Sequence, residues 1–230
     1  MQSENRVIAQ KIWDTIAESF DTTRQKPWSN CLEYIHSLNP TDIVADIGCG
    51  NGRHLLPCAE QCKSVFGVDV SSQFLQIVQK KLHHKLITNT SLIHADAVYL
   101  PFTADSFDAI LFIASLHNIK GKDYRHQALT EVARVLKPQG TALISVWSRW
   151  QDKYCKYFLK QLITRKREFG DIEVCWRQHH LNVPRFYHLY AKGEFLRDLQ
   201  SAGFQIQRCE SVKICSKRFP DNYFALVRKR

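Results

Sequence analysis

The segment Asp46-Ile47-Gly48-Cys49-Gly50-Asn51-Gly52 places one acidic residue and three alternating glycines directly after a short apolar run, residues 43–45. Glycine tolerates positive φ and carries no Cβ, so a ligand can approach the main-chain N–H groups of such a loop. The apolar run predicts a buried strand before the loop, and residues 53–61 predict a helix after it. This order of elements indicates a loop that binds a cofactor against the backbone.

The spacing of the glycines separates this loop from the loop that binds dinucleotides. The dinucleotide pattern is G-x-G-x-x-G, whereas the third glycine here, Gly52, comes one residue earlier. Asp46 stands at the strand end, where it would repel a pyrophosphate. A second acid, Asp69, ends the next predicted strand, residues 65–69, and could accept both hydroxyls of a ribose. We therefore expect a cationic ligand.

These residues resemble motif I of the class I S-adenosylmethionine (SAM) methyltransferases, whose usual form is (D/E)-x-G-x-G-x-G. Further segments match that family in the same order: Asp69 after strand two, His94-Ala95-Asp96-Ala97 after strand three, 107–112 with Ile113 as strand four, and 135–140 before strand five at 141–147. The resemblance implies SAM as the cofactor. Its implied contacts are Asp46, Gly48, Gly50, Gly52, Asp69, Asp96, Ala97 and Ile113.

The same resemblance implies an α/β fold of the Rossmann-like class I methyltransferase type. We expect a seven-stranded, mostly parallel sheet in the order 3-2-1-4-5-7-6 with helices on both faces. An N-terminal helical segment should precede the sheet, and an insertion should follow strand five. Helical patterns cover residues 5–20 and 28–38, and the final helix is expected at 194–202.

Length and composition favour a single domain over residues 1–230, because 44% of them are hydrophobic and no repeat or flexible linker divides the chain. We divide it into an N-terminal helical cap, a SAM-binding core, a basic substrate-binding insertion, and a final helix with a strand pair, at 1–38, 41–147, 148–190 and 191–230. No apolar run could span a bilayer and no signal peptide is evident, which favours a cytoplasmic protein without a membrane partner. The eight cysteines include no C-x-x-C pair, which predicts free thiols and no metal site.

The positive charge is concentrated in the last third. Residues 1–148 hold 14 Lys/Arg and 14 Asp/Glu, whereas residues 149–230 hold 18 and 8. Four cations, Arg149, Lys153, Lys156 and Lys160, would share one face if this segment were helical. A solvated helix face explains such a stripe alone, and an anionic membrane would also attract it. Together with Arg165-Lys166-Arg167 and Arg228-Lys229-Arg230, the stripe favours a polyanionic substrate such as RNA.

Two segments outside the common methyltransferase motifs resemble the tRNA wobble-uridine carboxymethyl methyltransferases. They are W-D-T-I-A-x-x-F-x-x-T-R-x-K-P-W at 13–28 and R-F-Y-H-L-Y-x-x-G-E at 185–194. The family esterifies 5-carboxymethyluridine in the tRNA anticodon. The resemblance implies that Lys26, Trp28, Arg185, Tyr187 and His188, with the basic Arg149, Lys153 and Lys156, bind the substrate. The chain departs from the family pattern at Asn118, Trp150 and Cys175.

A carboxylate acceptor is ionised at neutral pH, with a reference pKa near ~4, so its methylation needs positioning and no general base. Arg24, in the first of the two specific segments, is the predicted carboxylate clamp, because guanidinium offers a planar two-donor fork. His117, which follows strand four, could hydrogen-bond the base or the carboxylate. These two residues are the predicted catalytic pair.

Two other functions remain open from the sequence. One is a SAM-dependent methyltransferase of a small carboxylic acid, quinone or lipid precursor, which Arg24 and His117 would serve equally well. The other is a non-catalytic subunit that binds SAM and RNA. The resemblance also implies a small zinc-binding activator subunit as a partner, and residues 91–94, in the third strand, are the sheet edge where we expect it to bind.

Overall fold

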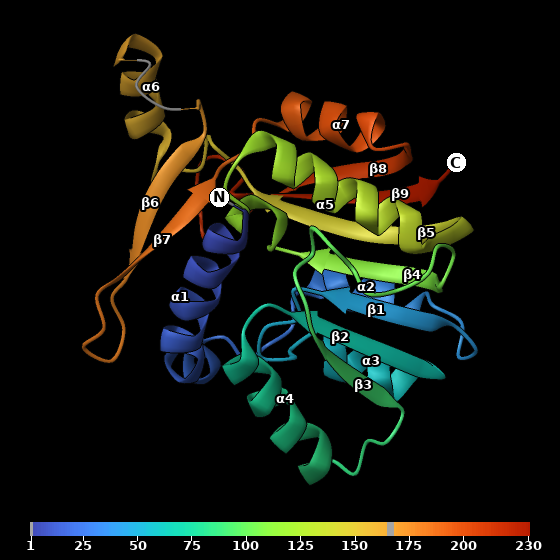
Figure 1. Cartoon of the computed structure of the whole chain (residues 1–230). Coiled ribbons are helices and arrows are strands. Elements are labelled where there is room, and N and C mark those ends of the chain that lie inside the picture. The colour runs from blue at the N-terminus through green and yellow to red at the C-terminus, as the bar shows by residue number, and fades with distance from the viewer. Residues whose placement is uncertain (1, 165–167) are drawn as a thin grey trace.

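The computed structural model describes residues 2–164 and 168–230. Its main sheet has seven strands in the order β3-β2-β1-β4-β5-β9-β8 (Figure 1). The strands are β1 (Ile43–Ile47), β2 (Ser64–Asp69), β3 (Thr90–His94), β4 (Phe107–Ile113), β5 (Leu136–Trp147), β8 (Phe204–Val212) and β9 (Asn222–Lys229). The first five are parallel, and β9 runs antiparallel between β5 and β8. This is the predicted order, since β6 and β7 belong to a separate sheet.

Helices cover both faces of the main sheet, as expected, because its central strands are apolar on both sides. On one face α2 (Ser29–His36), α3 (Leu55–Gln61) and α4 (Ser72–His84) contribute to one core cluster. On the other, α5 (Lys122–Val135) and α7 (Lys192–Ser201) contribute to a second. The strands end together at their carboxyl ends, where loops from both halves of the sheet meet.

The insertion after β5 forms a small layer of its own. It comprises α6 (Cys155–Thr164) and a two-stranded antiparallel sheet of β6 (Asp171–Trp176) and β7 (Val183–His188). Its apolar cluster is built around Tyr154, Phe158 and Tyr187. Because α6 begins only at Cys155, the cationic stripe predicted from 149 to 160 does not lie on one helix.

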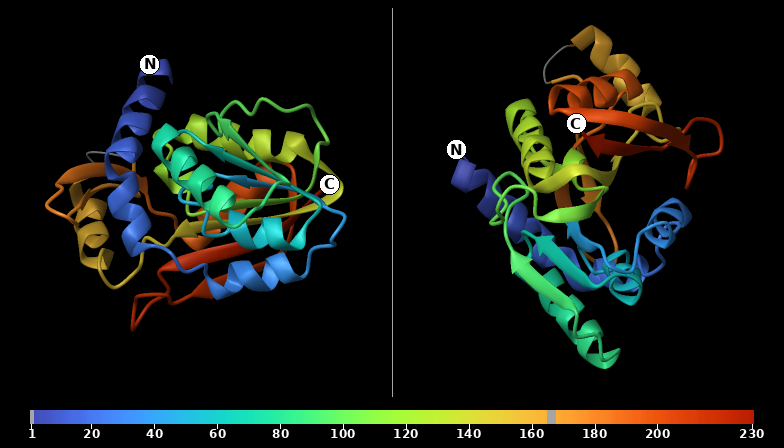
Figure 2. Two further views of the ribbon diagram at one scale, coloured as in Figure 1. Left: turned by 90° about the horizontal axis from the view of Figure 1, so that it is seen from below. Right: turned by 90° about the vertical axis from the view of Figure 1, so that its right-hand side faces the viewer.

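The N-terminal helix α1 (Gln2–Thr23) packs against α4 and β7, beside the carboxyl ends of the strands (Figure 2). Phe20 makes ring contacts with Phe74 of α4 and Trp176 of β6, at centroid distances of 5.4 and 5.6 Å. The helix therefore joins the cofactor half of the sheet to the insertion. No helix in the described parts of the chain is long and apolar enough to cross a membrane.

Candidate active site

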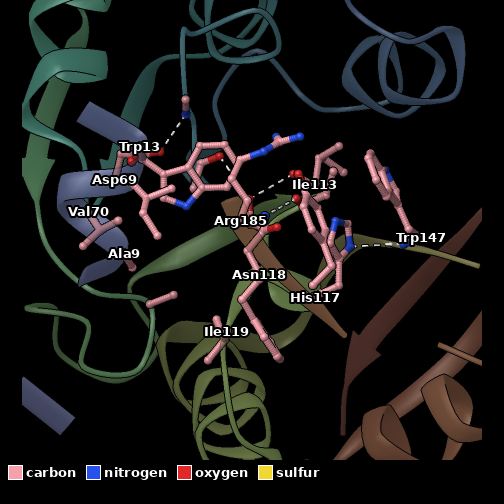
Figure 3. A pocket seen from close by; sticks show the side chains of 18 of the residues that line it. Ala9, Trp13, Asp69, Val70, Ile113, His117, Asn118, Ile119, Trp147 and Arg185 are labelled. Carbon is pink, nitrogen blue, oxygen red and sulfur yellow. Dashed lines mark hydrogen bonds between the residues drawn. The ribbon is translucent and has the colours of Figure 1, made fainter. Parts of the chain in front are cut away.

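A cavity of about 900 Å³ opens at the carboxyl ends of the parallel strands. The glycine loop and the end of β2 form one part of its wall, and the insertion forms the opposite part. Side chains of α1, including Ala9 and Trp13, line the space between them (Figure 3). The glycine loop and the basic insertion thus line the same cavity.

The glycine loop turns tightly enough to expose its backbone. Gly48, Gly50 and Gly52 have φ values of +69°, +52° and +80°, a region that residues with a Cβ rarely adopt. A Cβ on Gly48 would lie 2.2 Å from Ser115 Oγ, whereas a Cβ on Gly50 would meet nothing within 4 Å. Gly48 and Gly50 line the cavity, while Gly52 packs toward Val78 behind the loop. Conformation thus favours glycine at all three positions, and space also requires it at Gly48.

Two buried carboxyl groups lie beside this loop. Burial, and then the nearby Asp69 charge, raise the pKa of Asp46 to about 7, and Asp46 Oδ2 has no hydrogen-bond partner. Burial also raises the pKa of Asp69 to about 6, although its carboxylate accepts main-chain N–H groups from Gly50 and Ser71 at 2.8 Å each. A buried pair of acids, of which Asp46 has one oxygen without a hydrogen-bond partner, favours a cationic ligand. Asp69 lines the cavity and could accept the ribose diol of SAM, whereas Asp46 lies behind the lining and would act on the sulfonium and ammonium charges through its field.

The affinity for SAM is expected to rise with pH between 6 and 8. A carboxyl with a raised pKa is protonated below that pKa, and the neutral form loses its attraction to a cation. Since bound SAM would favour the ionised carboxylate, the ionisation of Asp46 alone should raise the affinity for SAM about tenfold between pH 6 and pH 8. Titration calorimetry at several pH values measures it. Asp46→Asn should flatten the dependence, and an equally steep dependence in that variant would contradict the assignment.

The residues predicted to contact the adenosine part of the cofactor also line the cavity. Asp96, Ala97 and Ile113 line the same wall as Asp69. Asp96 Oδ1 accepts the main-chain N–H of Val98 at 3.1 Å, which orders the turn after β3. Their contacts with adenosine remain proposals.

The opposite wall contains a buried guanidinium. Arg185, on β7, is 6% exposed, and its side chain lies over the rings of Trp13, Trp176 and Tyr187 at 5.6, 4.9 and 5.1 Å from their centroids. Its Nε has no hydrogen-bond partner, and no described carboxylate forms an ion pair with it. Burial lowers the pKa of this group, but guanidinium stays charged at neutral pH. A buried cation without an acidic partner is costly unless a ligand supplies the anion.

His117 forms the floor beside this cation. The imidazole is buried between ring contacts with Trp147 and Tyr187, and burial, with the nearby charges of His188 and Arg185, lowers the pKa of His117 to about 3. Its Nδ1 accepts the main-chain N–H of Trp147 at 3.1 Å. The neutral ring must therefore carry its proton on Nε2, where it serves as a hydrogen-bond donor. The group is unsuited to act as a base.

Comparisons with known proteins agree with this geometry. A family model described as a methyltransferase domain matches residues 45–144. A SAM-dependent methyltransferase structure from Methanosarcina mazei superposes with a TM-score of 0.73 at 22% identity, covering 89% of this chain and 98% of that one. A Burkholderia thailandensis N-methyltransferase with bound S-adenosylhomocysteine gives 0.71 at 17% identity, covering 100% and 90%. The chain contains a methyltransferase domain and has the class I SAM-dependent methyltransferase fold.

Two curated relatives of this chain carry the printed name tRNA (carboxymethyluridine(34)-5-O)-methyltransferase. The Xenopus tropicalis relative is 34% identical over 72% of this chain, and the match covers 25% of its own length. The Schizosaccharomyces pombe relative is 28% identical, with 90% of this chain and 92% of that protein covered. This chain thus spans about a quarter of the Xenopus protein and most of the yeast one.

Two predicted substrate contacts of the methyltransferase lie elsewhere in the structure. Arg149 is buried and donates to the Leu189 and Phe169 carbonyls and to Glu194. His188 is fully buried, with Nδ1 2.8 Å from Asp171 Oδ1 and Nε2 2.9 Å from Glu194 Oε1. Both side chains anchor the insertion, and neither lines the cavity.

This cluster also bears on the prediction that the chain binds no metal. Glu168, His188 and Glu194 offer ligand atoms within 4.8 Å of one another. Burial opposes a charge on the imidazole, yet hydrogen bonds to Asp171 and Glu194 raise the pKa of His188. Glu168 and Glu194 also pair with arginines. A cationic imidazole cannot ligate a metal, so we interpret the cluster as an ion-pair network.

The remaining predicted substrate residues are distributed over two neighbouring cavities and the surface of α6. Arg24 lines the cavity but is exposed, with its guanidinium 5.7 Å from the Trp176 ring centroid. Lys153 and Tyr187 line the cavity, and Lys156 is exposed on α6. Lys26 and Trp28 line a smaller neighbouring cavity that Arg24 shares. The triplet 165–167 lies outside the described residues. The interior cation is therefore Arg185, where the sequence suggested Arg24.

Sequence reasoning missed several side chains of the cavity wall. Arg53 follows Gly52 directly, so its place beside the cofactor loop was a usable signal. Trp147 ends β5, and its ring stacks on Tyr187 with centroids 4.8 Å apart and an 8° interplanar angle. A tryptophan at the end of a parallel strand could have been assigned to the ligand crevice on position alone.

Proposed function

We propose that this methyltransferase methyl-esterifies the carboxymethyl group of a modified wobble uridine in tRNA. The observation that carries the proposal is the buried, unpaired guanidinium of Arg185 on the cavity that also holds the glycine loop. A substrate carboxylate would supply the missing anion and satisfy its donors through a two-point hydrogen bond. The proposal explains why Arg185 is buried among aromatic rings despite the free energy lost on desolvating its charge.

The residues around Arg185 suit this acceptor. A carboxylate is already ionised at neutral pH, so no proton has to be removed before it attacks. His117, neutral and donating through Nε2, would bind the second carboxylate oxygen or the uracil edge without taking a proton. Bound SAM supplies a methyl group activated by its sulfonium. The protein aligns the carboxylate oxygen with this methyl group, and such alignment can lower the activation barrier by up to about 7–11 kcal/mol.

Three further observations favour RNA over a small acid. Two relatives are named for carboxymethyluridine, both specific segments contribute residues to the cavity lining, and the exposed Lys153 of the insertion lines it as well. Aromatic rings such as Trp176 and Tyr187 could stack on an unstacked base, the usual way of reading single-stranded loops. Of the family departures, Trp150 and Cys175 lie off the cavity, and Asn118 lines it through an amide.

One assay tests the proposal. The protein is incubated with labelled SAM and bulk tRNA that carries 5-carboxymethyluridine, and base-labile methyl label is counted. We expect label on tRNA that contains the carboxymethyl group and none on tRNA without it. Absence of transfer, also in the presence of a candidate activator, would refute the proposal. Transfer to a small carboxylic acid instead would favour the small-molecule methyltransferase.

Lys153 and Lys156 are proposed to contact the phosphate backbone. Replacing both with alanine should weaken tRNA binding and lower the slope of log affinity against log salt by roughly 0.7–0.9 for each lost contact. Fluorescence anisotropy at several salt concentrations measures the slope. Lys85→Ala, directly after α4 in an exposed pair with Glu60, is the matched control. An unchanged slope in the double variant would mean that these lysines only face water.

We also propose that a small zinc-binding activator covers the β3 edge. In the described parts of the chain β3 pairs on one side only, with β2, and Leu92 and Ile93 remain half-buried. Leu86, in the turn before β3, is 84% exposed. An open edge beside exposed apolar side chains is suited to a partner. Leu86→Glu should weaken co-purification with such a subunit.

A further inference from the structure

A second cavity, of about 400 Å³, adjoins the main one. Its walls come from the end of α1, the segment after it, and the start of the helix region that follows the glycine loop. Arg24, Trp28 and Arg53 line both cavities, so the two spaces share a wall. The cofactor assignment uses none of these three side chains.

The lining of this second cavity is cationic. Arg24, Lys26 and Arg53 contribute three positive charges, Thr22 and Thr23 add hydroxyl groups, and no acidic residue lines it. Among the described residues, no carboxylate forms an ion pair with any of the three cations. Burial, and then the opposing Arg24 charge, lower the pKa of Arg53, whose guanidinium lies 4.4 Å from the Trp28 ring centroid. Like charges held together in this way favour a bound anion.

Hydrogen bonds from residues on either side of Arg53 hold the main chain that carries Arg24 and Lys26. Asn51 Nδ2 donates to the Arg24 carbonyl at 3.0 Å, and the main-chain N–H of Trp28 donates to His54 Nε2 at 3.3 Å. Asn51 and His54 are both buried. The segment 24–28 is therefore fastened on both sides of Arg53. The gathering of cations is a product of the tertiary structure rather than of a mobile surface.

We propose that this cavity binds a backbone phosphate next to the nucleotide whose base enters the main cavity. This inference rests on the proposed function and extends it to a second contact point. Guanidinium binds phosphate oxygens through paired hydrogen bonds, and lysine adds a point charge. The shared wall of Arg24, Trp28 and Arg53 separates the two cavities by one layer of side chains, so a base in one and its own flanking phosphate in the other are compatible. The ligand is one phosphodiester, on the 5′ or the 3′ side of the modified nucleotide.

Neutral linkages test the proposal without relying on methyl transfer. An anticodon stem-loop RNA with 5-carboxymethyluridine is prepared in three forms: unmodified, and with one methylphosphonate on the 5′ or the 3′ side of that nucleotide. Their dissociation constants are measured by fluorescence anisotropy with the wild-type protein and with Lys26→Ala. Lys26 is exposed, so its truncation should not unfold the chain.

We expect one of the two neutral linkages to weaken wild-type binding by about tenfold, as for the loss of a charge-assisted contact. Lys26→Ala should bind the unmodified RNA less tightly and should lose most of its sensitivity to that same linkage, because the contact is already missing. The position that has the effect identifies the phosphate. Lys63→Ala is the matched control, since Lys63 is exposed next to the opposite end of β2 and lines neither cavity.

Two results would contradict the phosphate site, and only the second of them would also contradict the proposed function. In the first, the wild type methylates the stem-loop without methylphosphonates, but each neutral linkage weakens RNA binding by the same factor in the wild type and in Lys26→Ala. The phosphate site is then wrong, and the proposed function stands. If the wild type neither binds nor methylates the unmodified stem-loop, the proposed function fails and this inference fails with it.

Discussion

Arg185→Met is expected to lower kcat/KM for the carboxymethylated RNA by roughly 30- to 4,000-fold, while the melting temperature stays the same or rises. The loss follows from removing a buried charge that binds the substrate carboxylate, worth about 2–5 kcal/mol. Stability should be retained because the wild-type cation has no acidic partner among the described residues, and an apolar side chain of similar length avoids its desolvation. Methionine can also pack against the rings of Trp13 and Trp176. Steady-state kinetics and thermal unfolding measure the two effects.

Two controls separate positioning from folding in this prediction. Arg185→Lys keeps the charge but loses the planar fork, so its kcat/KM should lie between those of the wild type and Arg185→Met. The affinity for SAM should change by less than about threefold in either variant, because Arg185 lies on the acceptor wall. A melting temperature that falls together with activity in Arg185→Met would show that the guanidinium is structural.

Gly48→Ala is expected to abolish measurable SAM binding and to destabilise the fold. At φ +69° an alanine costs about 1–2 kcal/mol in conformation alone. The added Cβ would also lie 2.2 Å from Ser115 Oγ and 2.6 Å from Ser115 Cβ, so the loop or β4 must shift. That serine is itself held by the Gly48 and Ile113 carbonyls at 3.2 and 3.0 Å. Calorimetric SAM titration and thermal unfolding measure the outcome.

The chain offers a matched glycine for this experiment. Gly203, after α7, has φ +93° and no atom within 4 Å of a Cβ built on it, and it lines neither cavity. Gly203→Ala should therefore cost stability without weakening SAM binding. The double variant Gly48→Ala/Ser115→Gly should recover part of the SAM affinity, because both atoms in the clash are removed. No recovery would mean that the backbone conformation of Gly48, rather than Ser115, decides the effect.

The structure confirms the predicted sheet because its determinants are local. Each parallel strand is a short apolar run followed by a turn or helix signal, and β1 to β5 lie where those runs were found. The cofactor loop was equally readable, because Asp46 to Gly52 are consecutive and positive φ at glycine is a local requirement. SAM as the cofactor followed from those residues with the family resemblance.

The predicted cationic stripe depended on an assumed helical periodicity. Arg149 was placed with Lys153 and Lys156 on one helical face, but the helix starts six residues later, at Cys155. The charge of Arg149 is used inside the fold, against Glu194. A sequence pattern does not tell a buried, paired arginine from a solvent-facing one, because the partner is 45 residues away.

By itself, the sequence determined the methyl donor, because the atoms that fit SAM lie in short contiguous segments with fixed backbone requirements. Only the tertiary structure decided which side chains share the cavity with the glycine loop. Trp13, His117, Trp176 and Arg185 come from α1, the turn after β4, β6 and β7, and long-range packing brings them to one cavity. The same packing leaves Arg185 buried without an acidic partner and gathers Arg24, Lys26 and Arg53. Burial and the presence or absence of a partner are properties of three-dimensional neighbours, so they cannot be read from residue spacing.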